Sequence, residues 1–221
     1  PSPGTLAWHL NQSKDLLRTS SLERASKELE AAESMLKTAT QIEMADYWFL
    51  RGKWQTTSGS DQAASDAFKR AHQANPLAKY LAAWAEAEIR TRYQGDGHMP
   101  YPDLLDALVG DEPVLVSARS RVLAAEGKFE EAIAVADKIS GPEQHAARAL
   151  VYTMFSKPAE ALADCDSGLA LPGLPGNIRQ VLLVLRARAK FSLAKASAPE
   201  SGTDVLPPSG VAGIDPGLVK V

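Results

Sequence analysis

The segment whose residue types are best suited to chemistry is a glycine- and proline-rich loop at residues 94–102. Asp96 and His98 lie two residues apart in it, and a carboxylate beside an imidazole can form an acid–base pair or half of a metal site. One aspartate and one histidine are too few ligands for a metal, and the other histidines are scattered along the chain. We interpret the loop as an exposed turn whose Asp96, His98 and Tyr101 contact a partner.

The single cysteine, Cys165, is the other residue whose side chain could be reactive. It stands between Asp164 and Asp166, and nearby carboxylates raise the pKa of a thiol, whereas a reactive thiolate needs a lowered pKa. One cysteine excludes an internal disulfide and a cysteine-rich zinc site. The chain contains no phosphate-binding loop, no Gly-x-Ser-x-Gly and no His-Glu-x-x-His. We therefore expect Cys165 to be a small buried hydrophobic residue, and we predict no catalytic residue, no metal and no cofactor.

The composition of the chain limits its partners. Its 221 residues are 45% hydrophobic and 23% charged, which is ordinary for a globular protein. A net charge of -3 lacks the basic excess that nucleic-acid binding needs, and the longest apolar run, 181–185, is far shorter than a membrane span. We predict neither nucleic-acid binding nor membrane insertion. Because the chain begins with Pro1, we expect a processed or cut product, which leaves the compartment open, with the cytoplasm preferred over the periplasm.

Apolar residues recur at helical spacing along most of the chain, and no segment has the pattern of a β-strand. Residues 1–4 are expected to be a disordered lead, and residues 197–221, rich in proline and glycine, a disordered tail or linker. Helices are predicted at about 5–18, 22–36, 42–56, 61–74, 77–93, 103–109, 114–126, 129–139, 143–155, 158–170 and 178–196.

A short polar turn followed by a helix occurs three times in similar form. The segments GSDQAA (59–64), GKFEEA (127–132) and SKPAEA (156–161) each end on the alanine expected to be the first buried residue of the helix. Ala64 and Ala132 are 68 residues apart, which is two steps of 34, whereas Ala132 and Ala161 are 29 apart. A helix–turn–helix unit with a period near 34 residues is typical of a repeat protein.

Residues 45–78 contain the fullest copy of this unit. Small residues at Gly52 and Ala64 allow two antiparallel helices to approach closely. Arg51 and Gln55 depart from the usual residue types. The spacing resembles the signature of the tetratricopeptide repeat. Its matching positions are Trp48, Gly52, Gly59, Ala64, Phe68, Ala71 and Pro76.

The resemblance implies an all-α fold, a right-handed α-solenoid of antiparallel helix pairs over residues 5–196. It divides this domain into a best repeat at 45–78, a broken repeat at 79–112, two further repeats at 113–141 and 142–170, and a C-terminal capping helix at 178–196. In this family the first helices of the pairs line a concave face, which binds peptides, helices or other domains. On that face the resemblance predicts these partner-binding residues: Asp46, Phe49, Lys53, Tyr80, Trp84, Arg90, Arg121 and Met154.

The function implied by the resemblance is that of a protein–protein interaction scaffold or adaptor, and not of an enzyme. Some members hold the carboxylate of a chaperone tail with a lysine and an asparagine, but Phe49 and Lys53 stand at those places here. Two alternatives stay open: an accessory factor of a cell-envelope or secretion assembly outside the cytoplasm, and a helical-repeat enzyme using Asp96 and His98. The expected partner is another protein or peptide, with the chain's own C-terminal tail or a second copy as alternatives.

Overall fold

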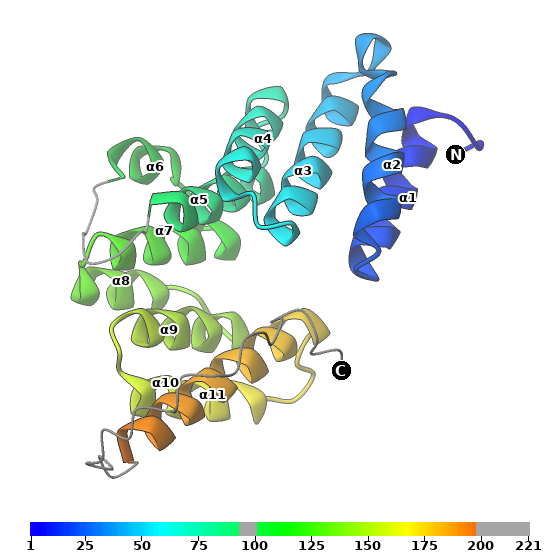
Figure 1. The fold of residues 1–221 in the computed structure, drawn as a ribbon. Coiled ribbons are helices and arrows are strands. Elements are labelled where there is room, and N and C mark those ends of the chain that lie inside the picture. Colours follow the sequence, from blue (N-terminus) through cyan, green and yellow to red (C-terminus); the bar gives the residue numbers. More distant parts are fainter. Residues whose placement is uncertain (93–100, 198–221) are drawn as a thin grey trace, which may run out of the picture.

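The computed structural model describes residues 1–92 and 101–197, and throughout these ranges the ordered elements are helices, without a strand (Figure 1). The predicted helices are all present, with ends that coincide with the prediction or differ from it by up to three residues. A 3-10 turn, Leu36–Thr38, follows the second helix. The α-helices are α1 Leu6–Arg18, α2 Leu22–Glu33, α3 Gln41–Thr57, α4 Asp61–Ala74, α5 Ala78–Arg92, α6 Pro102–Ala107, α7 Pro113–Ala125, α8 Phe129–Ala136, α9 Pro142–Met154, α10 Pro158–Leu169 and α11 Gly176–Ser197.

Four turns between paired helices have the same backbone geometry. A residue with positive φ ends the first helix of each pair, and a fully buried alanine follows five positions later. In each turn, the residue that follows the positive-φ residue donates its backbone N–H to the carbonyl of the residue five positions before it. The N···O distance is 2.8 to 3.0 Å in all four turns, and this hydrogen bond defines the Schellman cap. The positive-φ residues are Ser20, Gly59, Gly127 and Ser156, and the alanines are Ala25, Ala64, Ala132 and Ala161.

This shared turn shows that α1 and α2 form a copy of the same unit as the later pairs. The first pair matches the repeat only loosely in sequence, and serine stands at the left-handed position, as it also does in the turn at Ser156. A serine tolerates that conformation at a cost of about 1–2 kcal/mol. The Ser20 and Ser156 turns therefore adopt the geometry of the Gly59 and Gly127 turns with a residue that is less suited to it.

The helices follow one another around an open arc, with α1 and α2 at one end and α10 and α11 at the other (Figure 1). The extensive contacts are between the helices of a pair and between adjacent pairs. The last helix, α11, packs on α9 and α10. Each unit is therefore held by its neighbours, as in other solenoid proteins.

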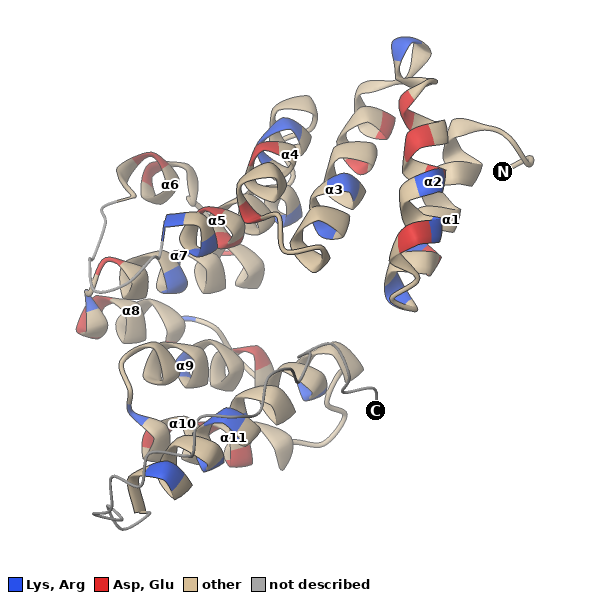
Figure 2. Cartoon of the chain, viewed as in Figure 1, with Lys and Arg blue, Asp and Glu red and all other residues tan. Residues whose placement is uncertain are grey.

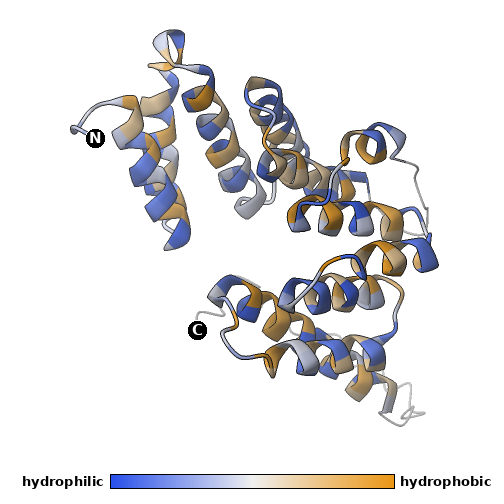
Figure 3. Cartoon of the chain, turned by 180° about the vertical axis from the view of Figure 1, so that it is seen from behind, coloured by the Kyte–Doolittle hydropathy of each residue, from blue (hydrophilic) through white to orange (hydrophobic). Residues whose placement is uncertain are grey.

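The hydrophobic core is divided into separate clusters along the arc. One cluster joins Leu10, Leu29 and Tyr47 at the α1 end, and another joins Cys165 and Leu182 at the α11 end. Figure 3 shows hydrophobic and hydrophilic residues alternating along the helices from one end of the arc to the other. A core of this kind transmits a packing defect mainly to the adjacent pair.

The repeat expected to be broken at 79–112 has a long first helix and a short second one. The second helix, α6, has only six residues, and Leu104 on it and Leu108 at its end are buried against α5 and α7. Because α6 is short, α7 packs directly on α5. Residues 93–100, which include Asp96 and His98, lie outside the described residues, as does the tail from residue 198.

Candidate functional site

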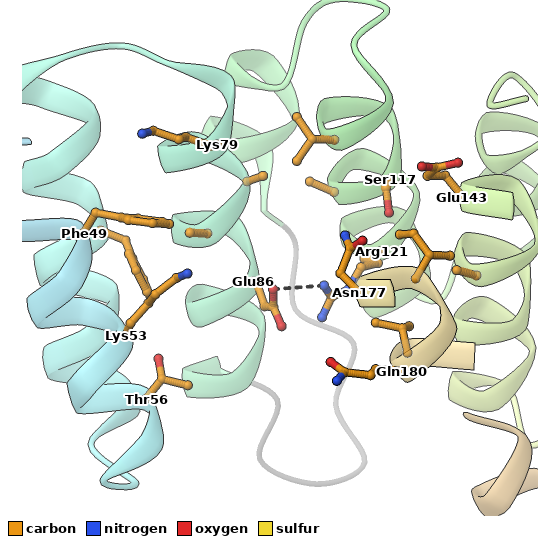
Figure 4. Close-up of a pocket in the computed structure, with 18 of the residues that line it drawn as sticks. Phe49, Lys53, Thr56, Lys79, Glu86, Ser117, Arg121, Glu143, Asn177 and Gln180 are labelled. Carbon is orange, nitrogen blue, oxygen red and sulfur yellow. Dashed lines mark ion pairs between the residues drawn. The ribbon is translucent and has the colours of Figure 1, made fainter. Parts of the chain in front are cut away.

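A groove runs along the inner side of the arc, with a volume of about 1270 Å³ (Figure 4). Its wall comes almost entirely from α1, α3, α5, α7, α9 and α11, with Phe68 added from α4. These odd-numbered helices are the first helices of the pairs, together with α11. Six helices thus contribute to one continuous surface.

The groove has small apolar side chains on its floor and charged groups distributed among them. Because alanine side chains are small, the groove has room for the side chains of a bound polypeptide. Asn177 and Gln180 of α11 close one side, and Figure 4 shows both projecting towards the centre. Apolar lining residues include Phe49, Ala82, Ala83, Val114, Ala118, Ala146, Leu150, Ile178 and Val181.

The α1 end of the groove gathers positive charge around an aromatic ring. The Lys53 ammonium lies 4.7 Å from the centroid of the Phe49 ring, and that of Lys79 lies 5.7 Å from it. Desolvation lowers the pKa of Lys53, and repulsion from Lys14 and Lys79 lowers it further. The Lys53 side chain is exposed, but it lies inside the groove, where other helices of the same chain displace part of the surrounding water.

Two of these three lysines have no carboxylate partner among the described residues. Lys79 contacts Asp46 at 3.5 Å, whereas no ion pair involves Lys14 or Lys53 within residues 1–92 and 101–197. Three like charges close together are unfavourable, and an anion placed between them relieves that repulsion. We call Lys14, Phe49, Lys53 and Lys79 the basic cluster.

The centre of the groove is electrostatically satisfied. The Glu86 carboxylate accepts from Arg90 at 3.1 Å and forms an ion pair with Arg121 at 3.2 Å, the pair drawn in Figure 4. Burial alone would raise the pKa of Glu86, but the two guanidinium groups hold that pKa below its ordinary value. Arg90 also donates to Asp61 at 3.0 Å and to Thr56 at 3.2 Å. This network fixes α3, α4, α5 and α7 relative to one another.

Four of the eight residues predicted for the concave face line the groove: Phe49, Lys53, Arg90 and Arg121. Asp46 lies outside the lining, where it accepts from the Tyr80 hydroxyl at 2.5 Å and contacts Lys79. Whether any of these residues binds a partner stays a prediction.

The predicted positions of Tyr80, Trp84 and Met154 on the groove surface are wrong. Tyr80 is only 1% exposed and packs against Ala45 and Ala71. Trp84 points towards α4, where its ring lies 6.4 Å from that of His72. Met154 packs among α7, α8 and α9.

The physical reason for these errors is helix phase. The groove-lining positions of α5 are Lys79, Ala82, Ala83, Glu86 and Arg90, which follow the helical period. Trp84 is one residue from Ala83, and one residue turns a side chain by about 100° around the helix. An aromatic residue adjacent to the correct stripe was therefore assigned to the wrong face.

The expected role of Tyr101 as an exposed partner contact is also wrong. It is 2% exposed and belongs to the cluster that joins α5, α6 and α7. Its backbone N–H donates to the Glu126 carboxylate at 2.6 Å, and the Arg92 guanidinium lies 5.6 Å from its ring. Tyr101 thus fixes the start of α6, while the two other loop residues, Asp96 and His98, lie outside the described part of the chain.

Several groove residues were not predicted, because the first pair and the last helix matched the repeat poorly. Lys14, Leu17 and Arg18 come from α1, and Asn177 and Val181 come from α11. The signal that could have found the α1 residues is the serine at position 20, five residues before Ala25. That spacing repeats the spacing of Gly59 to Ala64 and of Gly127 to Ala132.

Cys165 is fully buried, as predicted, and burial raises its pKa to about 11, with Asp164 and Asp166 adding to the shift. Among the residues that the structure describes, no three His, Cys, Asp or Glu side chains are grouped so as to hold a metal ion. In the same ranges, no helix combines the length and apolar character needed to cross a membrane.

Comparisons with known proteins identify the fold. No protein-family model matches the chain, and no curated protein matches it. The crystal structure of a thermophilic tetratricopeptide-repeat protein from Thermus thermophilus superposes with a TM-score of 0.63 and 18% identity, over 86% of this chain and 100% of that one. A complex of the TPR2AB domain of yeast Sti1 with pHSP90 covers 84% of this chain and 86% of that one, with 14% identity and a TM-score of 0.36. The first match, together with the repeated turn and the stacked pairs, shows that the chain is a tetratricopeptide-like helical-repeat protein in its fold.

Proposed function

We propose that this chain is a protein-interaction scaffold that holds a segment of another protein in its concave groove. The observation that carries the proposal is the basic cluster, in which Lys53 and Lys79 lie over the Phe49 ring and Lys14 adds a third positive charge, in a groove formed by six helices. Charged groups without a partner inside a hollow favour a ligand of opposite charge. Neighbouring alanines and Phe49 supply the apolar contact that such a ligand also needs.

The geometry favours a segment with acidic residues next to an apolar side chain. The acidic residues contact Lys14, Lys53 and Lys79, and the apolar side chain packs on Phe49. The rest of the segment runs past the Glu86–Arg121 pair towards α11. Neighbouring helices are about 8–10 Å apart and an extended chain advances about 3.3 Å per residue, so the groove accommodates on the order of ten residues.

The proposal is tested with a charge reversal at two exposed positions, which leaves the buried hydrophobic clusters unchanged. In Lys14→Glu/Lys53→Glu, two exposed lysines of the basic cluster become acidic, and capture of a partner from native extract should fall at least about tenfold. The matched control is Lys37→Glu/Lys138→Glu, which makes the same change in net charge at exposed positions outside the groove. The readout is quantitative mass spectrometry of captured proteins, with circular dichroism to verify the fold.

We expect wild type and the control variant to capture the partner and the Lys14→Glu/Lys53→Glu variant to lose it. If both double variants lose the partner equally, binding depends on net charge alone. If neither loses it, the basic cluster is not part of the binding surface, and the proposal in its present form fails.

A further inference from the structure

The last helix, α11, exposes an unusual amount of apolar surface. Among the described residues, eight large hydrophobic side chains are exposed, and four of them are on α11. Val181 belongs to the groove, but Leu183, Val184 and Phe191 are 47%, 54% and 72% exposed and do not line it. With about 100° per residue, these three and Ala187 lie on the side of the helix opposite the buried Leu182, Leu185 and Ala189. We call Leu183, Val184, Ala187 and Phe191 the outer face of α11.

The charge of α11 differs in sign from that of the whole chain. The helix has five basic residues and no acidic residue, whereas the chain has a net charge of -3. Arg186 forms an ion pair with Asp166 at 2.7 Å. The other four have no carboxylate partner within the part of the chain that the structure describes. On the helical wheel Arg188 and Lys195 border the outer face on one side, and Arg179 and Lys190 border it on the other.

The outer face also stands at the open end of the helix stack. Each earlier pair is covered by the next, and α11 packs on α9 and α10 with its buried side (Figure 1). Figure 2 shows the basic positions along α11 at this end of the arc. A further helix added here would continue the stacking that joins all the preceding units.

We propose that the outer face of α11 binds an amphipathic helix of a partner protein, one whose apolar stripe is bordered by aspartate and glutamate. Leu183, Val184 and Phe191 pack against the apolar stripe, and the four unpaired basic residues contact the acidic borders. This surface is separate from the basic cluster, so it binds whether or not the groove is occupied.

Two other occupants are less suited to this face. A second copy packed symmetrically through α11 would bring five basic residues against five more, which is repulsive. An anionic membrane would attract the same basic residues, but it would not continue the stack of helices that ends at α11. An acidic helix both pairs with the basic borders and continues the stack.

The test uses synthetic amphipathic helices of about three heptads, with leucine at the a and d positions. One peptide has glutamate at e and g, and the other has lysine there. Fluorescence anisotropy with the full chain should show the glutamate peptide binding at least about tenfold more tightly than the lysine peptide. Phe191→Ser should weaken binding of the glutamate peptide by about tenfold or more. The matched control is Val109→Ser, a 69% exposed hydrophobic residue away from α11, which should leave binding unchanged.

Equal affinity for the two peptides, or an equal loss in Phe191→Ser and Val109→Ser, would overturn the proposal. Flotation with phosphatidylserine-containing vesicles, beside pure phosphatidylcholine vesicles, tests the membrane: co-flotation that Phe191→Ser abolishes would assign the face to lipid instead. Sedimentation equilibrium tests the second copy, and a dimer that Phe191→Ser dissociates would assign the face to self-association. Wild-type behaviour of Lys14→Glu/Lys53→Glu in the peptide assay is expected, since the two surfaces are separate.

Discussion

A Gly52→Val substitution is expected to lower the free energy of unfolding by about 3 kcal/mol, because there is no room for a side chain at this position. A Cβ atom on Gly52 would lie 2.7 to 2.9 Å from three atoms of the Phe68 ring. Phe68 is 4% exposed, and its ring packs with Ala64 of α4 and Ala87 of α5 on the side of α4 that faces Gly52 of α3. It cannot move away without displacing one helix of the pair from the other.

Urea denaturation followed by circular dichroism measures this loss, and Gly176→Val is the matched control. Nothing lies within 4 Å of a Cβ atom at Gly176, and that residue begins α11. The control should therefore unfold within about 1 kcal/mol of wild type. Similar stabilities for the two variants would mean that α3 and α4 are farther apart than described here.

The second large effect is expected from Leu182→Ala, which should lower the free energy of unfolding by about 3 kcal/mol. Leu182 is fully buried where α9, α10 and α11 meet, in a cluster with Ala149, Cys165 and Leu185. The backbone of α10 approaches it closely, since a Cβ atom on Gly168 would lie 2.9 Å from its Cδ1 atom. The surrounding helices cannot collapse fully into the cavity that alanine leaves.

Leu183→Ala is the matched control for this substitution. The same residue type is removed one position along the same helix, but Leu183 is 47% exposed, so the change should stay within about 0.5 kcal/mol. Chemical denaturation of both variants decides the comparison. Equal losses would show that α11 is rotated from the orientation described here, and would also remove the basis for its outer face.

The helices and their stacking could be predicted from the sequence because both depend on local patterns. Apolar residues at helical spacing predicted the helices, and the sequence from Trp48 to Pro76 predicted the repeat. The requirement for a small residue at Gly52 followed from the same pattern, and the close approach of Phe68 is its structural cause.

Orientation around each helix could not be predicted as well, and the candidate site depends on it. Trp84 and Tyr80 are each adjacent in sequence to a lining residue, and only their contacts with His72 and Asp46 show that they face away. Tyr101 was interpreted as part of an exposed loop, but it is buried by long-range contacts with α5 and α7 that no local pattern records. The contribution of α1 was missed because the first pair matches the repeat only loosely in sequence, with Ser20 where Gly59 and Gly127 stand in two of the other turns.

If the groove is the working surface, the inner side of the arc, and not its outer side, contacts the partner. Site-specific photo-cross-linking in native extract distinguishes the two sides, with a photoreactive amino acid at Thr57, at Ser117 or at Ala134. Thr57 and Ser117 line the groove on α3 and α7, whereas Ala134 is exposed on α8 outside it. We expect Thr57 and Ser117 to cross-link to the same protein and Ala134 not to do so. Cross-links from Ala134, with none from either groove position, would contradict a partner held on the inner side.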